Sequence, residues 1–153
     1  MRPELPVRPA LALLFSVFSL FACGGPPGPA ALDTKNDACA WCRMGASDAR
    51  FAAQLVAPRE EPRFFDDIGC LAAFLAARPA PKGSLAFVAD HRTKAWVPAP
   101  SAVYTRNPGL QTPMSSHLLA HADAASRDAD PDARGGTTES AATIFGAGHL
   151  EGR

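Results

Sequence analysis

Two thiols and one thioether stand together in the segment Cys39-Ala-Trp-Cys-Arg-Met44. All three side chains are soft sulfur donors, a combination that suits a redox disulfide or a soft metal ion. A thioether cannot form a disulfide and binds Zn²⁺ poorly, but it is a good ligand for Cu(I). The thioether of Met44 therefore favours copper over the alternatives.

A second methionine of the same kind occurs far along the chain, in the segment Thr112-Pro-Met114. Apart from the initiator, Met44 and Met114 are the only methionines, and both stand next to turn residues rather than on an apolar stripe. Methionine usually fills gaps in a core, a role that fits neither position well. We therefore predict that Met114 is the second part of a copper site that begins at residues 39–44.

Three further side chains are weaker candidates for this site. His117 and His121 could each add an imidazole, although a solvated or core histidine is the commoner finding. Cys70 lies at the edge of the apolar stripe of a predicted helix, where we expect a buried small hydrophobe.

Other functions remain open for the cysteine pair. Zinc would need a second pair of ligands at a familiar spacing. The nearest candidates are Cys70, His91, His117 and His121, of which only the last two come close to such a spacing. A thiol–disulfide oxidoreductase would need a helix that begins at the motif, but Gly45 and Ser47 follow it and the preceding residues are polar. A binding lipoprotein without metal, in which the sulfurs pack or pair, is the third alternative.

The N-terminus has the layout of a bacterial lipoprotein signal. Arg2 and Arg8 precede an apolar run over 10–21, and a small residue and Cys23 follow it. The run has about 12 residues, whereas a membrane-spanning helix needs roughly 20. We predict a signal peptide over 1–22, lipidation of Cys23 and a Gly/Pro-rich tether over 23–36. The alternative is an ordinary signal peptide that leaves Cys23 as a free thiol.

The composition limits the class of the protein. The 15 Lys and Arg residues balance the 15 Asp and Glu residues, and there is no basic stripe, so we expect no nucleic-acid partner. Enough chain remains after residue 22 for one domain with a core, predicted over 37–145 and followed by a frayed tail over 146–153. Three cysteines besides Cys23 are an odd number, which argues against a disulfide framework in an exported chain.

The first half of the domain predicts a β-β-α-β order. Apolar alternation and β-forming residues give strands over 51–56, 63–65 and 85–89. Asp66 and Asp67 provide an N-cap for a helix over 67–77, whose apolar residues recur at helical spacing.

The second half repeats this order more weakly. Short strands are predicted over 95–97, 102–104, 117–121 and 143–145. A helix is expected over 123–133, but its apolar residues are alanines and Pro131 interrupts it, so disorder over 123–142 is the alternative. The predicted fold class is therefore α+β, with two similar small β-β-α-β units in one domain, the second of them eroded.

Several blocks occur along the chain in this order: Cys39-x-x-Cys-x-Met44, Phe51-Ala-Ala-Gln54, Phe64-Phe-Asp-Asp-Ile-Gly-Cys-Leu71, Phe87-Val-x-Asp90, Trp96, Ala102-Val-Tyr104 and Thr112-Pro-Met114. Together they resemble the NosL family of copper-binding lipoproteins, which are accessory proteins for the maturation of nitrous oxide reductase. The resemblance covers approximately residues 39–120.

This resemblance implies a periplasmic Cu(I) carrier rather than an enzyme, held on a bacterial membrane by lipidated Cys23. Its copper ligands would be Cys42, Met44 and Met114, with Cys39 as a less secure ligand. The partner would be a copper-accepting periplasmic enzyme or a copper-transfer protein, and nitrous oxide reductase is the client that the family suggests. Gly24 after the lipidated cysteine mildly favours the outer membrane.

Three residues depart from the family pattern. Arg43 stands where the family usually has glycine, and Ser115 and His117 replace glycines after the methionine. These departures concern the geometry of the loops next to the metal more than the copper chemistry itself.

Overall fold

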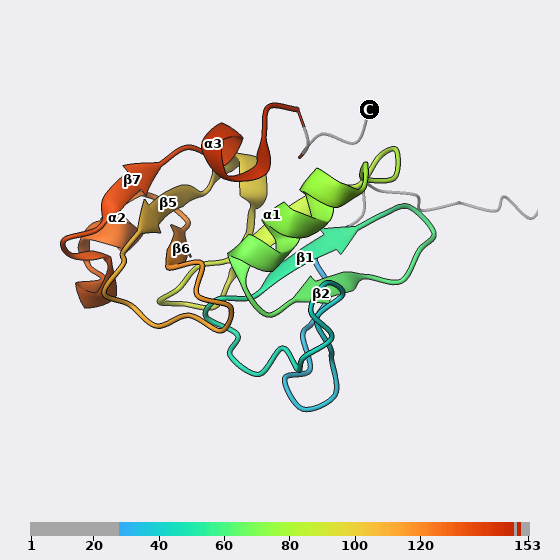
Figure 1. The fold of residues 1–153 in the computed structure, drawn as a ribbon, viewed down its shortest axis with the longest axis horizontal. Coiled ribbons are helices and arrows are strands. Elements are labelled where there is room, and N and C mark those ends of the chain that lie inside the picture. Colours follow the sequence, from blue (N-terminus) through green and yellow to red (C-terminus); the bar gives the residue numbers. More distant parts are fainter. Residues whose placement is uncertain (1–27, 149, 151–153) are drawn as a thin grey trace, which may run out of the picture.

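The computed structural model describes residues 28–148 and 150. The predicted signal peptide and the lipidated Cys23 lie outside these residues. Within them the chain folds into a four-stranded and a three-stranded antiparallel sheet with short helices (Figure 1), so the fold is α+β as predicted. In this part of the chain no helix is long and apolar enough to cross a bilayer.

The first unit runs through β1 (Ala53–Val56), β2 (Arg63–Phe65), α1 (Ile68–Ala77) and β3 (Leu85–Ala89). Strand β1 is central and pairs with β2 on one side and with β3 on the other. Strand β4 (Trp96–Pro98) extends the sheet beyond β3. The β-β-α-β order predicted for this half is confirmed, with β1 beginning slightly later than expected.

The second unit runs through β5 (Val103–Arg106), β6 (Leu118–His121), α2 (Ala124–Asp128) and β7 (Thr137–Glu139). Strand β5 is central and pairs with β6 and β7, as β1 does with β2 and β3. The two units therefore share one topology. The second is the eroded one, because α2 has 5 residues whereas α1 has 10.

Two predictions for the second half are wrong. Residues 143–145 are not a strand but belong to the helix α3 (Ala141–Phe145), which begins where the Ser140 side chain accepts a hydrogen bond from the Thr143 N–H. The last strand is instead β7, whose Thr-Thr-Glu sequence has no apolar alternation that would predict a strand. The alternative of disorder over 123–142 also fails, because α2, a 3₁₀ turn (Pro131–Ala133) and β7 occupy this stretch.

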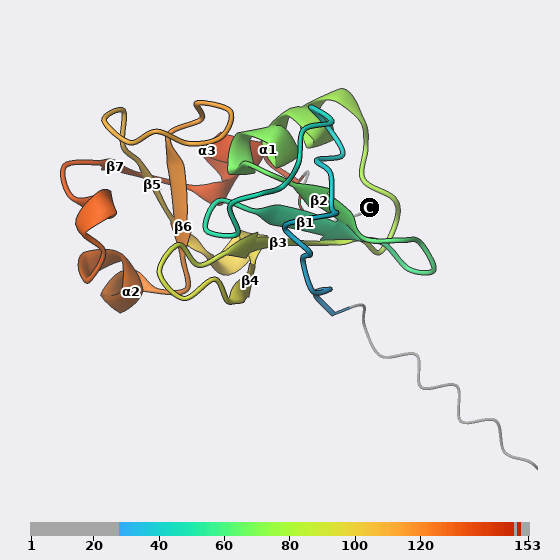
Figure 2. The same ribbon diagram turned by 90° about the horizontal axis from the view of Figure 1, so that it is seen from below.

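The apolar face of α1 lies on one side of the first sheet (Figure 2) and also meets α3 and β6. The Phe74 ring packs edge-on to Phe65 at 5.3 Å between centroids, and Phe145 of α3 packs against Tyr104 at 5.7 Å. Each such buried side chain contributes about 1.5–3 kcal/mol to folding. This packing fixes α1 against both units and thereby the position of its first turn.

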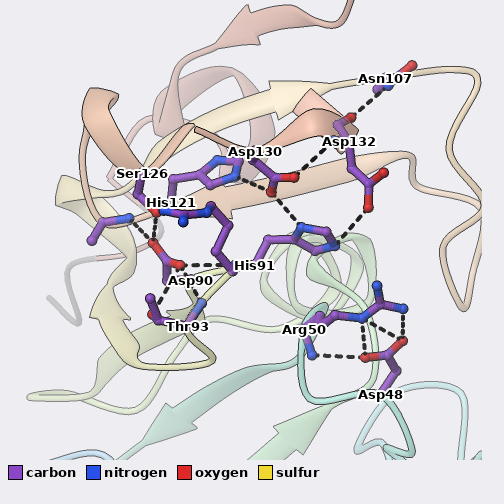
Figure 3. A network of polar contacts seen from close by, with 12 residues as sticks. Asp48, Arg50, Asp90, His91, Thr93, Asn107, His121, Ser126, Asp130 and Asp132 are labelled. Carbon is purple, nitrogen blue, oxygen red and sulfur yellow. Dashed lines mark hydrogen bonds and ion pairs between the residues drawn. The ribbon is translucent and has the colours of Figure 1, made fainter. Parts of the chain in front are cut away.

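Asp90 is a fully buried carboxylate that joins the two units. Its Oδ1 accepts hydrogen bonds from Thr93 in its own turn, and its Oδ2 accepts from the Ala122 N–H and the Ser126 hydroxyl, both at 2.8 Å. Figure 3 shows these contacts at the start of α2. Burial alone would raise the pKa of Asp90, but these hydrogen bonds hold it well below its usual range.

Asp90→Asn should lower the free energy of unfolding at pH 7 by about 2 kcal/mol, because an amide NH₂ cannot accept the two hydrogen bonds from the second unit. A depressed pKa stabilises the fold above the unfolded value of ~3.9, and this contribution is lost as the pH falls through and below that value. Urea titrations of both proteins between pH 2 and 7 measure this.

The difference in stability between the wild type and Asp90→Asn should shrink below pH ~4. Asp128→Asn is the matched control, because its side chain is 66% exposed and its loss should cost no more than about 0.5 kcal/mol. A stability difference for Asp90→Asn that stays constant from pH 7 to 2 would contradict this role.

Candidate metal centre

The cysteine pair lies on a tight loop that is attached to the edge of the first sheet. The Cys39 N–H donates to the Met44 carbonyl at 2.7 Å, and the Arg43 N–H donates to the Cys39 carbonyl at 3.0 Å. The Ala40 N–H donates to the carbonyl of Phe64 in β2 at 2.7 Å. The loop is closed by its own backbone and fixed to β2, so the positions of the two thiols are set by hydrogen bonds.

Four donor side chains converge beside this loop. One ligand atom each of Cys39, Cys42, Asp66 and Cys70 lies within 4.8 Å of the other three. Asp66 comes from the turn between β2 and α1, and Cys70 comes from the first turn of α1. The Cys42 Sγ lies 3.6 Å from both oxygens of Asp66. We call this set the thiol centre, and it could hold a metal ion.

Asp66 gives the thiol centre an unusual charge. Its residue is only 1% exposed, and in the described part of the chain its side chain has the weak Cys42 thiol as its hydrogen-bond donor and forms no ion pair. Buried carboxylates are normally paired with a cation or coordinate a metal. The thiol centre therefore offers three sulfurs and one carboxylate to a positive charge that the described residues do not themselves supply.

Two thiols of this centre, Cys42 and Cys70, hold their protons more firmly than free cysteine does. Burial raises the pKa of Cys42, and Cys39 and the negative charge of Asp66 raise it further against a lowering by the Met44 N–H. Burial raises the pKa of Cys70 as well, with Cys39 and Asp66 adding to the effect. Neighbouring negative charges disfavour a thiolate, so a bound cation is what would make thiolates favourable here.

The structure brings together two of the predicted site residues, Cys39 and Cys42, and adds two that sequence reasoning missed. Cys70 is buried as expected, but its sulfur belongs to the thiol centre rather than only to the core. Asp66 was expected to help cap α1, whereas Asp67 alone is the N-cap, with its Oδ1 accepting from the Gly69 N–H at 2.7 Å. The odd number of cysteines was the one signal that could have led to Cys70.

The backbones of the two predicted methionines are hydrogen-bonded to residues at or beside the thiol centre. The Met44 carbonyl closes the cysteine loop, and the Met114 N–H donates to Asp67 Oδ2 at 3.0 Å. The two residues are 57% and 41% exposed. Met44 therefore follows the thiols directly on their loop, and Met114 is hydrogen-bonded to the residue after Asp66, while both thioethers face solvent.

The loop that carries Met114 is seated closely on the first turn of α1. The Thr112 hydroxyl also donates to Asp67 Oδ2, at 2.8 Å. A Cβ atom on Gly69 would lie only 2.7 Å from the Cβ of Ser116, so only glycine permits this approach. His117, a weaker candidate ligand, contacts the Leu110 carbonyl through its Nδ1 at 2.7 Å and is not part of the thiol centre.

The other candidate histidine, His121, lies elsewhere. It belongs to a second buried group with His91 and Asp130, which shares no residue with the thiol centre. The structure therefore separates the imidazole and sulfur donors that the sequence left as one set.

Comparison with known proteins identified no relative of this chain. The chain matches no family model, no curated protein and no solved structure. The function must therefore be argued from the residues and the geometry.

Gly69→Ala should displace the Met114 loop from α1, because the new methyl group would overlap Ser116. The Met114 N–H would then lose its bond to Asp67 and exchange faster with solvent. Hydrogen exchange followed by NMR measures this. Gly45→Ala is the matched control, since a Cβ there meets nothing within 4 Å. Equal protection of Met114 in Gly69→Ala and the wild type would refute the close seating.

Proposed function

We propose that this protein is a metallochaperone that binds one Cu(I) at the thiol centre and passes it to a partner, without catalysing a reaction. The observation that carries the proposal is the convergence of three thiols on a buried carboxylate that has no cationic partner among residues 28–148. Thiolate and thioether are the ligands that select Cu(I). Cys42, Met44 and Met114 are the proposed principal ligands, with Cys39 and Cys70 as the buried thiols behind them.

The proposed copper ligands differ in their exposure to solvent, which suits transfer of copper to a partner. Cys39 and Cys70 are buried, Cys42 is partly exposed, and the thioethers of Met44 and Met114 face solvent. A partner's ligand would reach copper from the exposed side while the buried thiols still hold it. Asp66 already contacts the Cys42 sulfur, so its carboxylate would lie next to the bound ion.

Backbone conformation supports the resemblance to NosL proteins. Arg43, Ser115 and His117 have φ values of 68°, 56° and 59°. Only glycine adopts this region without strain, and other residues pay about 1–2 kcal/mol there. These are the three positions at which the family usually has glycine. The departures therefore occupy the backbone conformations that glycine would provide.

The cellular setting follows from the same resemblance. We propose that lipidated Cys23 holds the domain on the periplasmic side of a bacterial membrane, where a copper-accepting enzyme such as nitrous oxide reductase would receive the ion. Arg43, Arg63 and Arg78 line a cavity of about 370 Å³ next to Ala40 of the cysteine loop. An acidic surface on the partner would complement this basic wall.

Thiol–disulfide exchange is a less favoured function for the same cysteines. Enzymes that catalyse it lower the pKa of the attacking thiol at a helix N-terminus. Here burial and Asp66 raise the pKa of Cys42, and the motif lies on a turn rather than at the start of a helix.

Competition with a chromogenic chelator should show that Cys42→Ser weakens Cu(I) binding more than Cys39→Ser does. Met114→Leu, which keeps the apolar volume but removes the sulfur, should also weaken binding. Ser115→Ala is the control beside Met114, because its exposed side chain has no role in the centre and binding should not change. Binding that is equally strong in Cys42→Ser and the wild type would contradict the proposal.

An insulin-reduction assay separates the carrier from the oxidoreductase. The carrier should show no disulfide reduction above that of the Cys39→Ser/Cys42→Ser double variant. Disulfide reduction that needs no copper and is lost in the double variant would establish the enzyme instead.

A further inference from the structure

A second group of ligand-type side chains lies where the two units meet. His91 follows β3, His121 is the last residue of β6, and Asp130 follows α2. One ligand atom of each lies within 4.8 Å of the others, and none of the three residues is more than 4% exposed. The group contains no thiol and shares no residue with the thiol centre.

Both imidazoles point at one oxygen of Asp130 (Figure 3). The Nδ1 of His91 lies 2.7 Å from Asp130 Oδ2, and the Nε2 of His121 lies 2.9 Å from the same atom. Because a carboxylate only accepts hydrogen bonds, each of these two ring nitrogens carries a proton when no ion is bound. This assignment fixes the tautomer of each ring.

The opposite nitrogen of each ring is left without a partner. The Nε2 of His91 and the Nδ1 of His121 are buried and have no hydrogen bond among the described residues. The Nε2 of His91 lies 4.0 Å from a carboxylate oxygen of Asp132. In the neutral ring this nitrogen is an acceptor that faces another acceptor, and the Nδ1 of His121 is a second buried acceptor without a donor.

A metal ion between the three donors would reverse this pattern. Its bonds to His91 Nδ1 and His121 Nε2 would require lone pairs there, so the ring protons would move to the opposite nitrogens. The Nε2–H of His91 would then point toward Asp132. A carboxylate behind a ligating histidine is the usual outer partner in metal sites, where it orients the ring.

The geometry points to a Zn²⁺ site formed by His91, His121 and Asp130, with Asp132 orienting His91. Two imidazoles and one carboxylate are a borderline donor set that suits Zn²⁺, whereas Cu(I) prefers the sulfurs of the thiol centre. Tetrahedral bonds of ~2.1 Å set the donors ~3.4 Å apart. To admit the ion, the two ring nitrogens would move from Asp130 Oδ2 by about 0.5–0.7 Å and the rings would turn their lone pairs toward the ion.

Asp130 is also the member of the group that borders a cavity, which His91 and His121 do not line. This cavity of about 350 Å³ lies on the side of β5 and β7, and Thr105 and Thr138 also line it. Arg127 and Arg134 lie in the same wall, and Arg127 is paired with Asp128. A water entering from this side would supply the fourth ligand that three-ligand zinc sites have.

The test is Zn²⁺ binding by a thiol-free variant in which Cys23, Cys39, Cys42 and Cys70 are all serine. Titration with ZnCl₂ against a chromogenic chelator should give one Zn²⁺ per chain. The further change His121→Asn should abolish this binding, and Asp132→Asn should weaken it about tenfold. His117→Asn is the matched control, because its ring contacts the Leu110 carbonyl outside the group, and it should leave binding unchanged.

Absence of Zn²⁺ binding by the folded thiol-free variant, or equal binding after His121→Asn, would overturn the proposal. If circular dichroism shows that the thiol-free variant does not fold, ring ¹⁵N NMR of the wild type decides, with Zn²⁺ in excess over the thiol centre. Zn²⁺ should move the proton of His91 from Nδ1 to Nε2 and that of His121 from Nε2 to Nδ1. Unchanged tautomers of both rings would equally overturn the proposal.

Discussion

The candidate site depends on one buried carboxylate, Asp67, which holds two distant parts of the chain together. Its Oδ1 caps α1, and its Oδ2 accepts from the Thr112 hydroxyl and the Met114 N–H. In the described structure, no other side chain of the first unit forms a hydrogen bond with the loop that carries Met114. A bond to a charged acceptor is worth about 1.5–3 kcal/mol, so the contact is strong enough to position the loop.

The neighbouring Asp66 has the opposite role. It faces the thiols and accepts a hydrogen bond from Cys42, and it forms no ion pair within the described structure. Two consecutive aspartates therefore have different roles: Asp67 connects α1 to the Met114 loop, and Asp66 places a carboxylate beside the thiols. The short β2–α1 turn makes this possible, because successive side chains there point in different directions.

The two units carry different chemistry at equivalent corners. Phe65 is the last residue of β2 and pairs with the first residue of β1. His121 is the last residue of β6 and pairs with the first residue of β5. Asp67 and Asp123, two residues later, both cap the helix that follows. The corner of the first unit lies beside sulfur donors and that of the second beside imidazoles. A repeated scaffold can in this way keep a soft ion and a borderline ion apart.

The elements with strong periodicity could be predicted from the sequence. The helix α1 and the strands β1 to β3 follow from their apolar spacing and from the aspartate cap. Strand β7 could not, because its residues are polar and it exists only through pairing with β5. Helix α3 was missed because its five residues are too few to show a helical period, and the Ser140 cap alone is a weak signal.

The candidate site could be predicted only in part, for a similar reason. Cys39 and Cys42 are neighbours in sequence, and their spacing indicates a site. Asp66 and Cys70 join them only when α1 packs beside the cysteine loop, so each had a sufficient local explanation, as a cap and as a core residue. The His91–Asp130 contact spans two units and has no local pattern at all.

Copper X-ray absorption spectroscopy of the protein loaded with one equivalent of Cu(I) tests the central claim most directly. The thiol centre predicts a first shell dominated by sulfur, and Cys70→Ser should reduce the number of sulfur scatterers. A shell of nitrogen with the multiple scattering of imidazole, unchanged in Cys42→Ser, would place copper away from the thiols and contradict the account.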